Sequence, residues 1–146
     1  MKATYEVQLK IRKPVAEVFD AVVAPEKLSR YFVAAASAPL VEGTTVKWCF
    51  AEVPGEHDVI VRKVVRQERV VFEWDAPSGD HLIKVRMVFQ PLDGDNTLVQ
   101  ISESGWRDTP DEREASHGNA GGWMHMMCCL KAYLEYGINL RAGGAF

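Results

Sequence analysis

One acidic residue interrupts an apolar strand pattern, and it is the residue best placed for chemistry. Glu103 lies in phase with Val99 and Ile101, so its side chain is predicted to point inward with theirs. A buried carboxylate is costly unless it is paired or protonated, and its pKa can be raised. Such a group suits a proton donor or a hydrogen-bond anchor at the mouth of a cavity. The alternative is that the strand frays before Gly105 and leaves Glu103 in solvent.

Catalysis would need a second group that converges on this acid. His57, Tyr5 or Arg62 qualifies only if the fold brings it near Glu103. The sequence contains no G-x-S-x-G, no H-E-x-x-H and no phosphate-binding glycine loop before a helix. It therefore assigns no catalytic residue and no cofactor.

The cysteines and histidines offer one pair with metal-ligand spacing. His125 and Cys129 are four residues apart on one predicted helical face, but a zinc site needs three or four ligands and no second pair is close. We therefore predict no metal site. The odd count of three cysteines, with Cys128 next to Cys129, is typical of reduced thiols in a cytoplasmic protein rather than of disulfides.

Composition narrows the class of protein. The 146 residues carry a formal charge of −3, with 47% hydrophobic and 25% charged residues, which is a globular balance. The sequence lacks the basic stripe that is typical of nucleic-acid-binding proteins, so we do not expect it to bind DNA or RNA. No apolar run approaches the roughly 20 residues of a membrane span. The first residues alternate polar and apolar, unlike a signal peptide, which supports a cytoplasmic location.

Period-two alternation predicts most of the regular structure. Residues 4–11 form a half-buried strand, and Pro14 opens a short helix with apolar residues at 15, 18, 19 and 22. A second short helix is expected over 26–32, followed by an irregular connection over 33–45. Five more strands are predicted at 46–50, 57–65, 70–74, 82–91 and 97–105.

A long helix is predicted near the C-terminus. Thr109 to Glu112 forms a capping box with proline at the first helical position. The glycines at 118, 121 and 122 are expected to weaken or break the helix, like a hinge or cap, before the helical period resumes at Trp123. Gly137 is expected to end it.

Together these elements predict one α+β domain over residues 1–146. An antiparallel sheet with one buried face needs a cover, and only the C-terminal helix is long enough to supply it. We therefore expect a curved antiparallel sheet of about six strands wrapped around that helix, with two short helices after the first strand.

A cavity between sheet and helix would be lined by inward-facing side chains. Large aromatics with a few polar groups are typical of small-molecule pockets, although the same residues could simply fill a core. The candidate ligand-binding residues are Trp48, Phe50, Phe72, Trp74, Val85, Met87, Phe89, Ile101, Glu103, Trp123, Met127 and Leu130.

Three stretches resemble a known superfamily. They are 14–21 with 25–32, Arg69-Val70-Val71-Phe72-Glu73-Trp74, and Gly122-Trp123 followed by 130–137. Their order is similar to the START-like, helix-grip superfamily often called SRPBCC, in the group related to the C-terminal domain of the activator of the heat-shock-protein-90 ATPase. Where that group usually carries tryptophan, this chain has Tyr31 or Phe32.

The resemblance implies a fold with a cavity but not one activity. Members bind lipids, hormones or polyketide intermediates, some are cyclases, and some contact chaperones. We expect a small soluble protein, monomer or homodimer, that takes up a small hydrophobic molecule. The alternatives are a chaperone-associated interaction domain and a polyketide cyclase or dehydratase-like enzyme.

Overall fold

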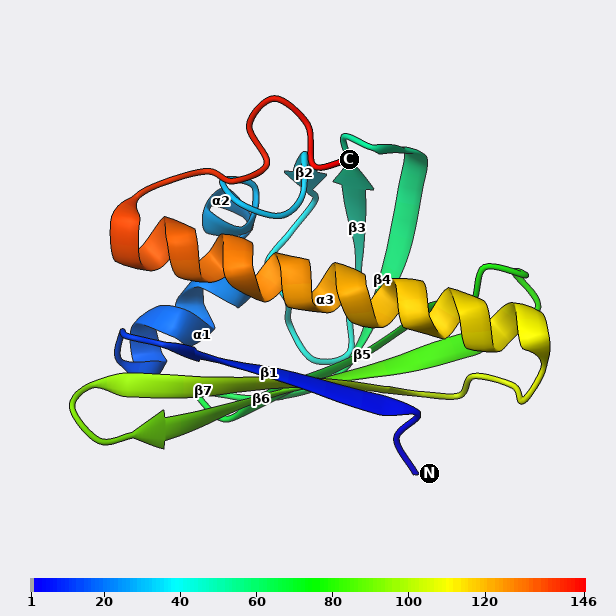
Figure 1. Ribbon diagram of the computed structural model, residues 1–146, viewed down its shortest axis with the longest axis horizontal. Helices are drawn as coiled ribbons and strands as arrows, with labels where there is room; N and C mark the ends of the chain where they lie inside the picture. Colours follow the sequence, from blue (N-terminus) through cyan, green and yellow to red (C-terminus); the bar gives the residue numbers. More distant parts are fainter. Residues whose placement is uncertain (1) are drawn as a thin grey trace.

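A computed structural model describes the fold of residues 2–146 (Figure 1). The chain begins with a strand and two short helices, continues through six strands and ends with a long helix and a short irregular segment. The elements are β1 (Tyr5–Ile11), α1 (Val15–Val23), α2 (Pro25–Leu28), β2 (Ala35–Ala36), β3 (Thr45–Phe50), β4 (Val53–Val65), β5 (Arg69–Asp75), β6 (Leu82–Leu92), β7 (Asn96–Ser104) and α3 (Pro110–Tyr136).

The strands form one antiparallel sheet in the order β1-β7-β6-β5-β4-β3-β2. Consecutive strands pair throughout, except that β1 pairs with β7. The register shifts near Cys49 and again near Arg62, and such irregularities bend a strand and increase its twist. Helix α3 lies across one face of this twisted sheet, with α1 and α2 grouped near its C-terminal half (Figure 1). The predicted α+β helix-grip architecture is confirmed.

The differences from the predicted strands are local. The sheet has seven strands because β2, a pair of alanines, joins the edge of β3. Two alanines carry no alternating pattern, so nothing in the sequence marked them. Strand β4 begins at Val53 and includes Pro54 and Gly55, which the sequence placed before the strand. The second short helix ends at Leu28 rather than continuing to residue 32.

Helix α3 is continuous, so the predicted break at the glycines is wrong. Thr109 caps the helix, its side chain accepting the N–H of Glu112 at 3.3 Å, and Pro110 follows at the first position. A glycine inside a helix costs about 1 kcal/mol relative to alanine. Here the buried side chains of the second half, from Trp123 to Leu130, hold the helix on the sheet and outweigh that cost. The predicted end is confirmed, since Gly137 adopts φ 67°.

Charged groups tie β1 to the end of α3. The carboxylate of Glu135 accepts the backbone N–H of Arg12 at 2.9 Å and its Nε at 2.7 Å. Lys131 Nζ donates to Glu135 at 2.6 Å and to the carbonyl of Lys10 at 2.8 Å. Because Glu135 is only 3% exposed, this contact fixes the C-terminal half of α3 on the edge strand.

The turn after β7 depends on a glycine. Gly105 has φ 101°, and a Cβ atom there would lie 3.0 Å from the carbonyl oxygen of Leu82. Only glycine combines this backbone conformation with such a close approach. The turn brings the following residue, Trp106, back toward the end of β7.

Candidate functional site

Most of the predicted cavity residues form a packed core. Ten of the twelve are buried with at most 3% exposure, namely Trp48, Phe72, Val85, Met87, Phe89, Ile101, Glu103, Trp123, Met127 and Leu130. Phe50 and Trp74 are half-buried. Roles of these residues in binding a ligand remain predictions.

An open pocket of about 210 Å³ lies at one end of this core. Of the predicted residues, Phe50, Trp74 and Trp123 line it. The rest of its wall comes from the loop after α2, the β3–β4 turn, the first half of α3 and the C-terminal segment, through Phe32, Glu52, Val53, Gly118, Asn119, Gly122, Arg141 and Phe146. Residues far apart in the sequence thus share one small hollow.

Aromatic rings dominate the pocket wall. Trp74 and Trp123 stack with centroids 5.5 Å apart and an interplanar angle of 24°. Phe32 lies 5.7 Å from Trp123 and 5.1 Å from Phe50. Offset and edge-to-face contacts of this kind hold rings in fixed positions. This part of the wall is therefore apolar, aromatic and already formed.

Two glycines of α3 leave room beside these rings. A Cβ atom on Gly118 or Gly122 would meet no atom within 4 Å, although both residues line the pocket. They are four residues apart, so they lie on one face of the helix. No contact within residues 2–146 requires glycine here.

Glu103 lies behind the pocket wall as a buried hydrogen-bond hub. Its side chain is 1% exposed, which confirms the inward orientation and excludes a solvated strand end. Oε2 accepts Trp123 Nε1 at 2.9 Å, and Oε1 accepts Trp106 Nε1 at 3.0 Å. Asn119 Nδ2 lies 3.3 and 3.4 Å from the two oxygens, and the Tyr5 hydroxyl donates to Oε1. Glu103 thereby positions two pocket-lining residues without lining the pocket itself.

The fold brings one of the three possible acid–base partners to Glu103. Burial first, and then the charge and hydrogen bond of Glu103, raise the pKa of Tyr5 far above its ordinary value. Arg62 pairs instead with Glu73 at 2.6 Å, and His57 packs against Phe50. Glu103 is sealed from solvent, and the hydrogen bond from Tyr5 to Glu103 joins β1 to β7.

An ion pair closes the rim of the pocket. Arg141 of the C-terminal segment pairs with Glu52 of the β3–β4 turn, and the two side chains are 12% and 13% exposed. The Arg141 guanidinium lies 5.9 Å from the ring centroids of both Phe32 and Phe146. These contacts hold the C-terminal segment against the pocket. In Figure 1 the C-terminus lies beside the end of β3.

Two larger hollows have less suitable walls. One of about 630 Å³ lies between α1 and the β4–β5 turn, with Phe19 as its one aromatic side chain. Another, of about 430 Å³, is lined mainly by charged residues around His57. Small-molecule sites are lined mainly by hydrophobic and aromatic side chains, so the smaller pocket, with five aromatic side chains in its wall, is the better candidate.

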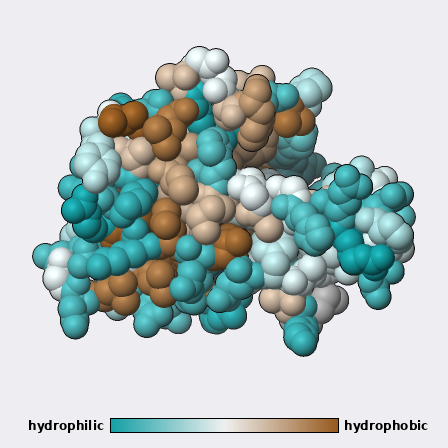
Figure 2. Space-filling model, viewed as in Figure 1, coloured by the Kyte–Doolittle hydropathy of each residue, from teal (hydrophilic) through white to brown (hydrophobic). Residues whose placement is uncertain are grey.

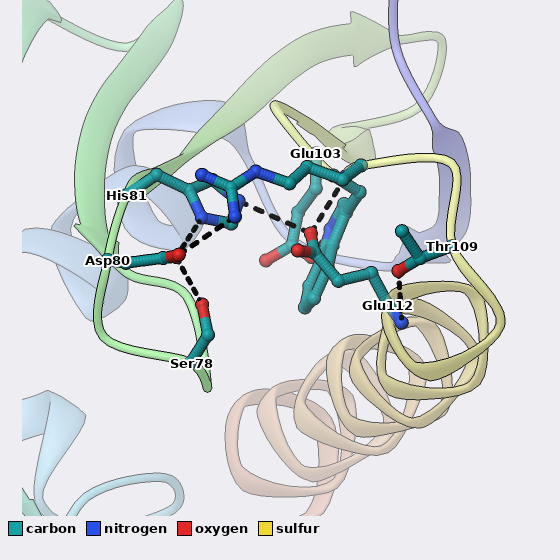
Figure 3. Close-up of polar contacts among 8 residues, drawn as sticks. Ser78, Asp80, His81, Glu103, Thr109 and Glu112 are labelled. Atoms are coloured by element: carbon teal, nitrogen blue, oxygen red, sulfur yellow. Dashed lines mark hydrogen bonds and ion pairs between the residues drawn. The ribbon is translucent and has the colours of Figure 1, made fainter.

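A second polar cluster joins the β5–β6 turn to the start of α3 (Figure 3). His81 Nδ1 lies 2.8 Å from Asp80, and its Nε2 lies 3.2 Å from a carboxylate oxygen of Glu112 without forming a hydrogen bond. Hydrogen bonds from Ser78, His81 and Arg107 hold the pKa of Asp80 well below its ordinary value. This cluster anchors the helix start, where hydrophilic residues also gather on the surface in Figure 2.

His125 and Cys129, the pair with metal-ligand spacing, both lie on α3. Within residues 2–146 no three His, Cys, Asp or Glu side chains are arranged to hold a metal ion. Cys129 Sγ lies 3.7 Å from His125 Nε2, but burial raises the pKa of this thiol and disfavours the reactive thiolate. In the same residues, no helix has the length and apolar character needed to cross a membrane.

More than half of the residues that line the pocket were not predicted from the sequence. A break in the helix was predicted at Gly118, Asn119 and Gly122, so the sequence provided no basis for predicting which way these residues face. Phe32 had a signal, because either Phe32 or Tyr31 stands where the resembling group usually carries tryptophan. Its neighbour Tyr31 is buried elsewhere and donates to the carbonyl of Ala21 at 2.9 Å.

Solved structures share this fold. Protein SSP2350 from Staphylococcus saprophyticus aligns with a TM-score of 0.78 and 24% identity, covering 94% of this chain and 96% of that one. The Aha1 dimer from Colwellia psychrerythraea gives 0.75 and 21%, with coverages of 90% and 96%. DynU16, a putative protein in the dynemicin biosynthetic locus, gives 0.77 and 24%, with coverages of 90% and 47%. At such identities the likeness establishes the fold alone.

The sequence itself places the chain in a family. No curated protein sequence is similar enough to count as a relative. The family described as Activator of Hsp90 ATPase homolog 1-like protein, however, matches residues 12–135. The match runs from the residue after β1 to the last turn of α3 and includes every pocket-lining residue except Arg141 and Phe146. This chain therefore belongs to the Activator of Hsp90 ATPase homolog 1-like family.

Proposed function

We propose that this protein binds a small hydrophobic, aromatic ligand in the pocket between Trp74, Trp123 and Phe32. The observation that carries the proposal is a preformed aromatic wall beside two helix glycines with unfilled space. At about 210 Å³, the pocket is smaller than the roughly 300–1,000 Å³ usual for small-molecule sites. The ligand is therefore small, or part of it projects into solvent.

Dye binding to matched leucine variants tests the proposal. We expect N-phenyl-1-naphthylamine, an uncharged dye that fluoresces in apolar surroundings, to bind saturably to the purified protein. In Gly122→Leu the added side chain enters the pocket, so the dye should bind at least roughly tenfold more weakly, since the wall is already formed and cannot yield easily. Fluorescence titration measures the dissociation constant.

Gly121→Leu is the control. Gly121 lies in the same helix and also has open space around it, but it does not line the pocket. Both substitutions should raise the free energy of unfolding by about 0.5–1 kcal/mol, because leucine is the better helix former. Equal loss of dye binding in both variants, or no binding to the original protein, would reject the proposed site.

Interaction with a chaperone is the second candidate, and family membership favours it. The family description names an activator of the heat-shock-protein-90 ATPase. If this chain has that activity, adding it to the heat-shock-protein-90 homologue of its source should raise the rate of ATP hydrolysis. An unchanged rate at saturating protein rejects this candidate. We also propose a cytoplasmic location, because the free thiols of Cys49, Cys128 and Cys129 are typical of a reducing compartment.

A further inference from the structure

The geometry points to Asn119 as the residue that sets the specificity of the pocket. Its carbonyl oxygen, Oδ1, accepts a hydrogen bond from the ligand, so the pocket selects aromatic molecules that carry an O–H or N–H donor. This inference rests on the proposed function, because Asn119 lines the same pocket.

Glu103 fixes the orientation of the Asn119 amide. A carboxylate accepts hydrogen bonds, whereas an asparagine side chain presents donors on nitrogen and an acceptor on oxygen. The two tryptophans at Glu103 are donors only, and the Tyr5 hydroxyl also donates to it. The nitrogen of Asn119 must therefore face this carboxylate, as its distances of 3.3 and 3.4 Å show.

The carbonyl oxygen is consequently left on the other side of the amide. Within residues 2–146, no hydrogen bond to Asn119 Oδ1 is formed. The residue is half-buried and its helical neighbours on the pocket side are Gly118 and Gly122, where no side chain stands in the way. A ligand stacked on the aromatic wall can therefore reach this oxygen.

The other polar side chains of the wall are already engaged. Trp123 Nε1 donates to Glu103, and Arg141 pairs with Glu52. Asn119 Oδ1 is thus the uncharged side-chain acceptor that remains for a ligand in the described wall. Because hydrogen bonds in a chain polarise one another, donation by Nδ2 to a buried carboxylate strengthens Oδ1 as an acceptor. The negative charge of the buried Glu103 disfavours an anionic group beside Asn119, and the charge of Glu52 is offset by Arg141.

A pair of probes of nearly equal shape tests the inference. Indole carries an N–H donor, whereas benzofuran has an oxygen acceptor in the same ring position. Chemical-shift titration of the ¹⁵N-labelled protein gives both dissociation constants and shows whether the Asn119 side-chain amide responds. We expect indole to bind roughly tenfold more tightly than benzofuran, the advantage of about one net hydrogen bond over an unpaired acceptor.

Two kinds of variant complete the test. In Asn119→Leu the ratio of the benzofuran and indole dissociation constants should fall to about one. Asn119→Ala gives the same measurement without added bulk, in case leucine disturbs the helix. Phe50→Leu alters a wall without polar atoms, so both probes should weaken together while the ratio persists. Equal binding of both probes to the original protein, or a ratio unchanged in the Asn119 variants, overturns this inference alone. Binding of neither probe overturns the proposed pocket as well.

Discussion

Replacing Glu103 by glutamine is expected to lower the free energy of unfolding by about 3 kcal/mol. The carboxylate is 1% exposed and accepts hydrogen bonds from two tryptophans, a tyrosine and an asparagine. A glutamine amide keeps one acceptor oxygen but turns its nitrogen, a donor, toward groups that are themselves donors. At least one indole N–H then loses its partner in the buried interior. Urea unfolding followed by circular dichroism measures the change.

Two comparisons separate this effect from a simple change of charge. Glu6→Gln makes the same substitution at an exposed position on β1, and should change stability by less than about 0.5 kcal/mol. Tyr5→Phe removes one donor and leaves the carboxylate with its other partners, so a loss of about 1–2 kcal/mol is expected. If Glu103→Gln unfolds at the same urea concentration as Glu6→Gln, the hydrogen-bond hub does not stabilise the fold.

Replacing Glu135 by glutamine should have the second-largest effect, and one that depends on pH. Burial disfavours the charged carboxylate, but the hydrogen bonds and charges of Arg12 and Lys131 outweigh it and lower the pKa of Glu135 from its ordinary 4.5 to about 2. A group with a lowered pKa in the folded state stabilises that state while it is ionised. At pH 7 we expect Glu135→Gln to cost about 2 kcal/mol.

The contribution of Glu135 should be complete above about pH 5 and should be lost as pH falls toward 2. The difference in free energy of unfolding between the original protein and Glu135→Gln is therefore expected to shrink across that window. Glu17→Gln is the control, because Glu17 forms an exposed 4.0 Å pair with Lys13 whose contribution is small. A difference that stays constant from pH 7 to pH 2 would contradict this interpretation.

The strands that alternate strictly were predictable because burial on one face imposes a period of two. On β7 this period identified Glu103 as inward without any structural information. The glycines of α3 were misread because propensity is a local property, whereas the helix is held by the packing of Trp123 and the residues after it. β2 carried no signal, since its pairing depends on where the loop before β3 happens to lie.

The sequence alone therefore determined the sheet, the covering helix and the burial of one acid between them, since each follows from side-chain periodicity along a single element. Only the tertiary structure decided where space remains. The predicted cavity residues mostly fill the core, and the pocket arises where Phe32, Asn119 and Arg141 meet from three distant segments. The proximity of these three segments depends on how the elements pack and where the chain turns. A local sequence pattern encodes neither of these. For the same reason, Glu103 was predictable as buried but not as the residue that orients Asn119 and Trp123 at the pocket wall.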